Sequence, residues 1–553
     1  MPQTREHLAI CELLGVDRGL VVLTKADLVD EEMLELAEEE VSDLLADGPL
    51  ANVPIVAASA QTGDGIDRVR DTLLELVRTA PARADDARPA RLHVDRSFVK
   101  HGFGAVATGT WTGRPRAVGD AMVLEPGARR VKIRGLERHG EAVEQAIAGA
   151  RIAVNLQGIE HEAIHRGDLL TEPDALLASA AFDASLHWLA RDASLEDAAS
   201  AELLTGTTER RARVALIGDA PIAPGERGFV RIHVDGPPLH LLPGDRFVLR
   251  GFSREAGVGS TIGGGVVLDV APPHRRRRDP ALHRDLETLA NATPAEAVQV
   301  RITRAGLAGT TKKSLALETG FDAIALDAAL HDAAGRDTIV VLDSGRCLEA
   351  DAARRLMESL RATLERFHES DPLQAGMPRA RLLGSLPENV PAEIGSALLD
   401  RLVADRELAI SGEGVSLAGH APTLDAEQTR LAEMLSKRLR ESGLDAPALR
   451  TIAEESGEDE GRLRALAHHL EREGVLVAAP DELFFDRAAV MELSQRVVAH
   501  LDANEELDTQ TLKSMIGTTR RTAMPLMALL DDLQVTRREG SVRRLRGREP
   551  RWQ

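Results

Sequence analysis

The first 80 residues alternate short apolar runs with amphipathic stretches. Residues 20–23 and 53–58 are brief apolar runs, a pattern typical of buried parallel strands. Residues 4–14, 30–45 and 64–77 instead carry apolar positions at helical spacing. Polar residues follow each apolar run directly. The pattern predicts a small α/β unit that presents polar side chains at the carboxyl ends of its strands.

From residue 91 the pattern changes to short alternating runs punctuated by glycine, which indicates β-structure. These runs fall into two sets, residues 91–170 and residues 182–270. A basic run, Arg275 to Arg278, then stands beside two prolines and marks the next boundary. We interpret this run as a solvated linker, because isolated charge runs are common on protein surfaces.

Beyond residue 279 the pattern is helical with small hairpins, and a weak internal repeat is visible. The second strand of each predicted hairpin contains one of four residues spaced 60 to 69 positions apart, namely Leu348, Leu417, Phe485 and Leu545. Helices followed by a β-hairpin at this length predict four winged-helix modules in tandem.

Length, charge and cysteine content narrow the class of protein. A chain of 553 residues is expected to hold several domains. Its net charge of −20 argues against binding nucleic acid along the whole length, so any RNA site should be local. Cys11 and Cys347 lie too far apart in sequence to suggest a disulfide framework, which favours the cytoplasm. Neither a signal peptide nor a run of about 18 apolar residues is visible, so no membrane association is expected.

The two apolar runs of the first unit end in residues that suit a guanine base. The carboxylate of Asp27 can accept hydrogen bonds from both guanine N–H groups, and the stem of Lys25 can lie across the ring. The turn at Ser59 and Ala60 can offer a backbone N–H to the base oxygen. With the segment PQTREH (residues 2–7), this resembles the base-recognition half of a translational GTPase. The resemblance implies GTP with Mg²⁺ as cofactor and five guanine-binding residues: Thr24, Lys25, Asp27, Ser59 and Ala60.

A phosphate-binding loop is missing from the sequence. The glycine-rich turn followed by Gly-Lys-Ser/Thr has no match, and the nearest segment, residues 306–314, has the wrong spacing. In the resembled family this loop and the switch segments precede PQTREH. We therefore expect Met1 to lie inside the GTPase domain, through a mis-assigned start or an incomplete gene model; a genuine remnant is the alternative. As written, the chain is not expected to hold Mg·GTP in the normal way, so GTPase activity rests on the resemblance alone.

Several short segments of the two β-rich stretches resemble the selenocysteine-specific elongation factor (SelB) family. They are DRSF, TGT, RGD, DRFVLR and TIGGGVVLD. The resemblance implies a multidomain fold: a partial α/β P-loop-type GTPase domain, two β-barrels and tandem winged-helix (α+β) modules. The expected GTPase part is residues 1–80 and the barrels are residues 90–175 and 180–272. The winged helices are expected at residues 280–350, 351–420, 421–486 and 487–547.

The function implied by the resemblance is translation elongation. Such a factor, a monomer, would deliver selenocysteyl-tRNA to the ribosome at a recoded stop codon after binding an mRNA hairpin, with GTP hydrolysis timing release. The alternative is a GTP-independent RNA-binding protein that uses only the barrels and winged helices.

The resemblance also implies an aminoacyl pocket formed by Asp95, Arg96 and Arg151, which match the family's Asp-Arg pair and later Arg. A selenol ionises more easily than a thiol, so the esterified residue would be an anion near neutral pH. Two guanidiniums would stabilise this anion and would be poorly paired around a neutral serine. Without the resemblance, an ordinary salt bridge between Asp95 and either arginine is the simpler interpretation.

The last predicted module is basic. Residues 519–551 contain nine Arg against four acidic residues, a local balance of +5. Arginine at the start of a recognition helix and along the following hairpin suits phosphate contact and base stacking in a hairpin RNA. The candidate RNA-binding residues are Arg520, Arg521, Arg537, Arg538, Arg543 and Arg544. A basic, disordered tail without a particular partner is the alternative.

Two further motifs are interpreted as structural. Residues 161–165 match H-E-x-x-H, the pattern of a zinc peptidase, but the flanks are β-like and no third ligand is evident. We expect a strand-connecting loop there and no metal site. The glycine-rich residues 259–265 lack the Rossmann spacing and a following helix, and are interpreted as a barrel turn.

Overall fold

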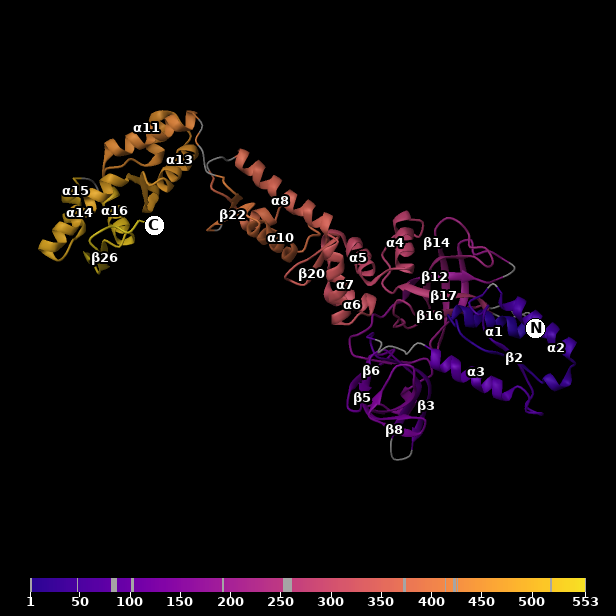
Figure 1. Cartoon of the computed structure of the whole chain (residues 1–553). Coiled ribbons are helices and arrows are strands. Elements are labelled where there is room, and N and C mark those ends of the chain that lie inside the picture. The colour runs from indigo at the N-terminus through magenta and orange to yellow at the C-terminus, as the bar shows by residue number, and fades with distance from the viewer. Residues whose placement is uncertain are drawn as a thin grey trace. The chain divides into compact units, whose positions relative to one another are not determined.

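The structure is a computed structural model with an α/β unit, two β-barrels and a series of helical modules (Figure 1). It describes residues 2–46, 48–80, 87–100, 104–190, 193–251, 261–370, 374–412, 414–420, 424, 426–517 and 520–552. The chain forms two compact units, residues 1–353 and residues 354–553. Within the described ranges, no helix has both the length and the apolar character needed to cross a membrane.

The N-terminal α/β unit contains two parallel strands, as predicted. Its elements are α1 (Pro2–Leu13), β1 (Val21–Thr24), α2 (Glu31–Leu45), β2 (Ile55–Ala58) and α3 (Ile66–Thr79). The side chain of Asp30 caps α2 by accepting a hydrogen bond from the Met33 amide at 3.0 Å. The apolar face predicted for α3 is open to solvent, with Leu73 49% and Val77 73% exposed.

The first barrel is a sheet closed by the pairing of β10 with β7. Its strand order is β10-β4-β3-β11-β6-β7-β8, and a short pair, β5 (Arg116–Ala117) with β9 (Gln145–Ala146), lies apart from it. The strands of the closed sheet are β3 (Arg91–Lys100), β4 (Gly104–Thr112), β6 (Ala121–Glu125), β7 (Arg129–Arg138), β8 (Glu141–Val143), β10 (Arg151–Gln157) and β11 (Leu169–Thr171). Alternate side chains fill the interior, and Trp111 is fully buried there.

The second barrel is closed in the order β12-β15-β14-β13-β16-β17. Its strands are β12 (Ala181–Trp188), β13 (Ala198–Thr205), β14 (Thr208–Ile217), β15 (Arg227–Val234), β16 (Arg246–Arg250) and β17 (Thr261–Asp269). In its core the rings of Phe182 and Phe247 meet edge to face, with centroids 5.9 Å apart.

The glycine-rich stretch of the second barrel lies in a strand, so the predicted turn was wrong for its described part. Gly263 to Gly265 belong to β17, whereas residues 259 and 260 lie outside the described residues. A Cβ at Gly265 would stand 1.8 Å from the Ser185 carbonyl oxygen. At Gly264 it would stand 2.5 Å from the Phe247 carbonyl oxygen and 2.9 Å from Leu13 of α1. Glycine therefore serves close packing here, between strands and against α1.

The basic run after the second barrel is attached to that barrel. Arg277 donates hydrogen bonds to the Leu216 carbonyl at 2.9 Å and to the Asp197 carboxylate at 3.0 Å. Arg278 pairs with Asp219 at 3.3 Å. Arg277 is therefore attached to the barrel, contrary to the predicted solvated linker, whereas the Arg278 side chain is 74% exposed and remains solvated as predicted.

The first helical module completes the first unit. It comprises α4 (Pro280–Ala290), α5 (Pro294–Arg304), β18 (Thr310–Thr311), α6 (Lys312–Thr319), α7 (Ala323–Gly335), β19 (Ile339–Val341) and β20 (Arg346–Glu349). Leu282 and Leu286 of α4 pack against Ile217 and Leu268 of the second barrel. Helix α8 (Ala350–Ser370) then carries the chain across the boundary between the two units.

The second unit repeats the pattern of helices followed by a hairpin. After α8 its elements are β21 (Met377–Pro378), α9 (Arg379–Leu383), α10 (Ala392–Ala404), β22 (Leu408–Ser411), β23 (Gly414–Leu417), α11 (Ala426–Ser442), α12 (Leu449–Ser456), α13 (Glu460–Arg472), β24 (Leu476–Ala479), β25 (Leu483–Asp486), α14 (Arg487–Asn504), α15 (Thr509–Ile516), α16 (Arg520–Asp532), β26 (Thr536–Glu539) and β27 (Val542–Leu545). Leu348, Leu417, Phe485 and Leu545 each lie in the second strand of a hairpin, as the repeat predicts. Each set of helices with its hairpin is called a hairpin module here, and the third and fourth modules end in β24–β25 and β26–β27. One continuous core joins these two modules.

Candidate functional site

The carboxyl ends of β1 and β2 lie side by side and bring the predicted guanine-binding residues to one sheet edge. Thr24, the last residue of β1, is paired in register with Ala58, the last residue of β2. Lys25 follows in the left-handed conformation with φ 63°, and Asp27 lies exposed in the single 3₁₀ turn Ala26–Leu28. The left-handed residue turns the chain sharply, so the Asp27 carboxylate stays at the strand end.

The loop after β2 is held in shape by its own hydrogen bonds. The buried Ser59 hydroxyl accepts from the amides of Gln61 and Thr62, both at 3.2 Å. Gly65 has φ +74°, and a Cβ there would stand 2.1 Å from the Ala57 carbonyl oxygen. Ala60 lies exposed at the tip of this loop. The arrangement fixes the backbone next to Asp27, as recognition of a planar base requires.

The predicted aminoacyl residues meet on the outer face of the first barrel. Asp95 is the extra residue of a β-bulge in β3, because Val94 pairs with Gly109 and Arg96 pairs with Thr108. Arg151, at the start of β10, donates from Nε and Nη2 to the Asp95 carboxylate at 3.0 and 2.8 Å. The Arg151 side chain is 57% exposed, and Arg96 is exposed nearby.

This geometry leaves cationic groups available for an anion. The Asp95–Arg151 contact is the salt bridge that the simpler interpretation predicts, yet it engages only two of the three Arg151 nitrogens. Burial acts to raise the pKa of Asp95, but hydrogen bonds from Arg151 and Thr108 hold that pKa below its usual value. Arg96 has no ion pair among the described residues. One carboxylate therefore stands beside two guanidiniums, which leaves a local excess of positive charge.

Thr108 is a member of this cluster that the sequence analysis missed. Its hydroxyl donates to Asp95 Oδ1 at 2.7 Å and accepts from Arg151 Nη2 at 3.3 Å. The side chain is buried, so no solvent competes for these bonds. A threonine within a strand carries no distinctive signal in the sequence. Only the bulge at Asp95 brings the carboxylate over the neighbouring strand.

The C-terminal arginines have different environments. Arg543 is only 6% exposed and pairs with Asp531 of α16 at 3.2 Å, so its guanidinium is not available for RNA. This burial contradicts the prediction that Arg543 contacts RNA. The residue instead attaches the β26–β27 hairpin to α16. Arg544 pairs with Glu506 at 2.6 Å and Arg537 pairs with Glu539 at 3.0 Å, but both remain partly exposed.

The remaining predicted RNA contacts lie at the start of α16 and in the hairpin. Arg521 is exposed and donates to the Ala446 carbonyl at 3.1 Å, and Arg538 donates to the Gly540 carbonyl at 3.1 Å. Neither carbonyl neutralises the arginine charge. Arg520 begins α16, but its side chain lies outside the described residues.

The H-E-x-x-H segment lies between β10 and β11, where a connecting loop was expected. His161 to Ala163 form a single 3₁₀ turn, which is too short to align both histidines on one helical face. Across the described ranges, no group of three or more His, Cys, Asp or Glu side chains has the arrangement of a metal site.

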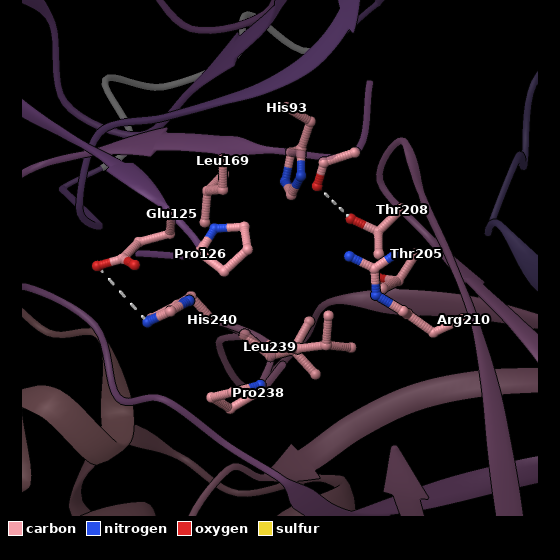
Figure 2. A pocket seen from close by; sticks show the side chains of 12 residues that line it. His93, Glu125, Pro126, Leu169, Thr205, Thr208, Arg210, Pro238, Leu239 and His240 are labelled. Carbon is pink, nitrogen blue, oxygen red and sulfur yellow. Dashed lines mark hydrogen bonds and ion pairs between the residues drawn. The ribbon is translucent and has the colours of Figure 1, made fainter. Parts of the chain in front are cut away.

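Figure 2 shows a small pocket between the two barrels, which the sequence analysis did not predict. Its volume of about 30 Å³ accommodates a water molecule but not a nucleotide or an amino acid. His93 and Arg210 line one side, and His240 lies 3.9 Å from Glu125 on the other. Beside the pocket, Arg91 donates two hydrogen bonds to Asp245, at 2.6 and 2.8 Å. This region joins the barrels and is not large enough to be a ligand site.

Four parts of the chain match models of protein families. Residues 1–79 match the elongation factor Tu GTP binding domain, and residues 182–274 match the selenocysteine-specific elongation factor beta-barrel domain. Residues 361–417 and 499–545 match two winged-helix domains of elongation factor SelB.

Curated relatives are similar along almost the whole chain. The selenocysteine-specific elongation factor of Desulfomicrobium baculatum is 32% identical over 99% of this chain and 86% of its own length. That of Escherichia coli K12 is 28% identical over 99% of this chain and 84% of its own length. A crystal structure of bacterial selenocysteine-specific elongation factor EF-Sec has a TM-score of 0.59 at 22% identity, covering 99% of this chain and 84% of that structure. That last likeness concerns the fold alone.

Proposed function

Because this chain belongs to the selenocysteine-specific elongation factor family, we propose that it delivers selenocysteyl-tRNA to the ribosome. Delivery would take place at a recoded stop codon that an mRNA hairpin marks, with the cytoplasm as the place of action and a monomer as the active form. The family relationship covers nearly the full chain, which supports the main interpretation over a GTP-independent RNA-binding protein.

The cluster of Asp95, Arg96 and Arg151 carries the proposal. An esterified selenocysteine with an ionised selenol would receive the charge of Arg96 and the free nitrogen of Arg151. Serine in the same place would leave Arg96 and the third nitrogen of Arg151 without an anionic partner, at a cost of about 1.5–3 kcal/mol per lost charged hydrogen bond. Asp95 keeps Arg151 in position and is itself held by Thr108. Discrimination would therefore come from charge, not from the size of the side chain.

The edge formed by β1 and β2 is proposed to recognise guanine. Asp27 would accept from the base N–H groups, the Lys25 stem would cover the ring, and the loop at Ser59 and Ala60 would contact the base oxygen. Thr24 would line the same edge. GTP with Mg²⁺ would supply the hydrolysis that times tRNA release in a family member that has a phosphate-binding loop. This sequence has no match to that loop, so the proposal for this chain is confined to recognition of the guanine base. The match of residues 1–79 to a GTP binding domain supports this assignment.

The fourth hairpin module is proposed to bind the mRNA hairpin. Arg521, Arg537, Arg538 and Arg544 remain accessible on α16 and the β26–β27 hairpin, and Arg520 begins the same helix. An exposed arginine contributes to binding through phosphate contact and stacking on unpaired bases. Arg543 is left out of this set because it is buried against Asp531.

The test is a comparison of selenocysteyl-tRNA with seryl-tRNA carrying the same tRNA body. In the full chain, Arg96→Ala with Arg151→Ala should reduce the preference for selenocysteyl-tRNA by about 10- to 100-fold, from the loss of charged hydrogen bonds. Arg138→Ala, which removes an exposed charge elsewhere on the same barrel, should leave the ratio unchanged. An unaltered preference in the double variant would contradict the proposed pocket.

A further inference from the structure

A second ion pair lies on the outer face of the first barrel, near the Asp95 cluster. Lys100, the last residue of β3, donates a hydrogen bond to the carboxylate of Glu137 near the end of β7. Leu136 beside Glu137 points into the barrel core, so Glu137 points outward. Both side chains of the pair are partly exposed. The face that is proposed to receive an anionic group therefore carries a second carboxylate besides that of Asp95.

This ion pair bridges two strands of the sheet. β4 and β10 lie between β3 and β7, because β3 pairs with β4, β4 with β10 and β10 with β7. Three strand spacings amount to about 14 Å. The Lys100 and Glu137 side chains must therefore extend toward each other across the outer face, which fixes the direction of the Glu137 carboxylate.

Strand register shows that this direction leads away from Arg151. Lys100 is level with position 104 of β4. Glu137 is level with position 108, through its pairing with position 153 of β10, and Arg151 is level with position 110. Along the strand direction, Lys100 and Arg151 thus lie on opposite sides of Glu137. Pairing with Lys100 turns the carboxylate away from Arg151.

Glu137 nevertheless lies within reach of Arg151. The two residues occupy adjacent strands on the same face, and Arg151 is two positions from Ala153, the Cα partner of Glu137. Such diagonal neighbours are about 7–8 Å apart, a distance that long side chains can bridge. Nη1 of Arg151 makes no hydrogen bond to Asp95, which binds Nε and Nη2. A Glu137 released from Lys100 would compete with an external anion for this nitrogen.

The charges on this face make the competition decisive. Arg96, Lys100 and Arg151 supply three positive charges, whereas Asp95 and Glu137 supply two negative charges. The excess of one positive charge is what an anionic aminoacyl group would neutralise. Without the charge of Lys100 the two carboxylates would balance the two arginines, and an incoming anion would find no excess.

We propose that Lys100 is a positioning residue that holds Glu137 away from Arg151 and so keeps Arg151 Nη1 open to the ionised selenol of the esterified amino acid. This inference rests on the proposed function, because it takes the Asp95 cluster as the aminoacyl pocket. Lys100 acts through Glu137 and does not itself contact the amino acid. Discrimination by charge therefore depends on a residue outside the pocket.

The experiment measures the affinities of the full chain for selenocysteyl-tRNA and for seryl-tRNA with the same tRNA body. Lys100→Met should lower the ratio of the two affinities about 10-fold, because Glu137 then takes one charged hydrogen bond of Arg151 from the anion. Lys100→Met with Glu137→Gln should restore the ratio, and Lys100→Arg should keep it. Lys132→Met removes an exposed lysine on β7 of the same barrel and should leave the ratio unchanged.

Two results would overturn the proposal. One is an unchanged ratio in Lys100→Met. The other is a loss that persists in Lys100→Met with Glu137→Gln, since Lys100 would then act on the tRNA directly. A crystal structure of Lys100→Met provides a measurement without tRNA, in which the Glu137 carboxylate should lie at hydrogen-bonding distance from Arg151. A carboxylate that still points away from Arg151 would also contradict the positioning role.

Failure of this inference is distinguishable from failure of the proposed function. A ratio near one in the wild-type protein would refute the aminoacyl pocket itself. A clear wild-type preference that Lys100→Met leaves intact would refute only the role of Lys100.

Discussion

At the scale of single residues, the aminoacyl cluster depends on a bulge and a hydroxyl. The bulge directs Asp95 toward β4 and β10, where Thr108 and Arg151 reach its two oxygens. Without the extra residue, the side chains after Val94 would point to the opposite faces of the sheet. The Thr108 hydroxyl donates a further hydrogen bond to Asp95 Oδ1, which also accepts from Arg151, and so helps to fix the orientation of the carboxylate.

We predict that Thr108→Val raises the pKa of Asp95 and weakens discrimination between selenocysteyl- and seryl-tRNA about fivefold. The reason is the loss of one hydrogen bond of about 1 kcal/mol to the carboxylate that positions Arg151. NMR titration of the Asp95 carboxyl and tRNA competition would measure the two effects.

Two controls separate this role from simple destabilisation. Thr108→Ser keeps the hydroxyl and should restore both values. Thr171→Val also removes a buried hydroxyl of the same barrel, one that donates to the Ala90 carbonyl at 3.0 Å, and should change neither value. An Asp95 pKa that is equal in Thr108→Val and wild type would exclude the positioning role.

At the scale of elements, β3 serves two different sites. Its first half joins the barrels, because Arg91 pairs with Asp245 and His93 is enclosed next to them. Its second half carries Asp95 and Arg96 on the outer surface. Burial, and then the nearby charge of Arg91, lowers the pKa of His93 to about 4, against an opposing effect of Asp245. His93 is therefore neutral in the folded protein at neutral pH.

A pH-dependent stability follows from the His93 pKa. Well above pH 6.5 the residue is neutral in both states and contributes no pH dependence. As the pH falls from about 6.5 to about 4, the unfolded chain takes up a proton that the folded chain does not, so the free energy of unfolding decreases. Over that window the loss amounts to about 3 kcal/mol.

The variant His93→Gln isolates this contribution. Its free energy of unfolding, measured by denaturant titration between pH 4 and pH 7, should depend less on pH than that of the wild type. Other histidines with lowered pKa values, such as His233, contribute equally to both proteins and cancel in the difference. Parallel curves for the two proteins would mean that the pKa of His93 is the same in the folded and unfolded states.

At the scale of the whole molecule, positive charge is concentrated in an acidic chain. Residues 519–551 form a local basic region within a protein of net charge −20. This region lies in the second compact unit, residues 354–553. In the second unit, the third and fourth hairpin modules share one core, which includes Leu466 of α13 and Leu530 of α16.

This shared core predicts that the two modules lose structure together. Leu466→Ala should cost about 2–5 kcal/mol through the cavity it leaves, and amide exchange should become faster in α16 as well as in α13. Leu399→Ala is a matched control, because Leu399 is equally buried but belongs to the separate core of the second module. Faster exchange confined to α13 would show that the modules unfold independently.

Much of the architecture was predictable because it depends on local pattern. Parallel strands β1 and β2, the alternation of the barrels and the four hairpins with Leu348, Leu417, Phe485 and Leu545 follow from periodicities that the sequence shows directly. The motifs also led to the correct family. The glycine run of β17 was misinterpreted because its cause, close contact with Ser185, Phe247 and Leu13, involves residues far away in sequence.

The sequence by itself therefore determined the order of the elements, the family and the candidate residues, because these are properties of neighbouring positions along the chain. Only the tertiary structure decided how those residues are used. It placed Thr108 in the Asp95 cluster and buried Arg543 against Asp531. Each of these outcomes depends on strand register or helix packing, which brings distant segments together and thereby decides which charges are paired.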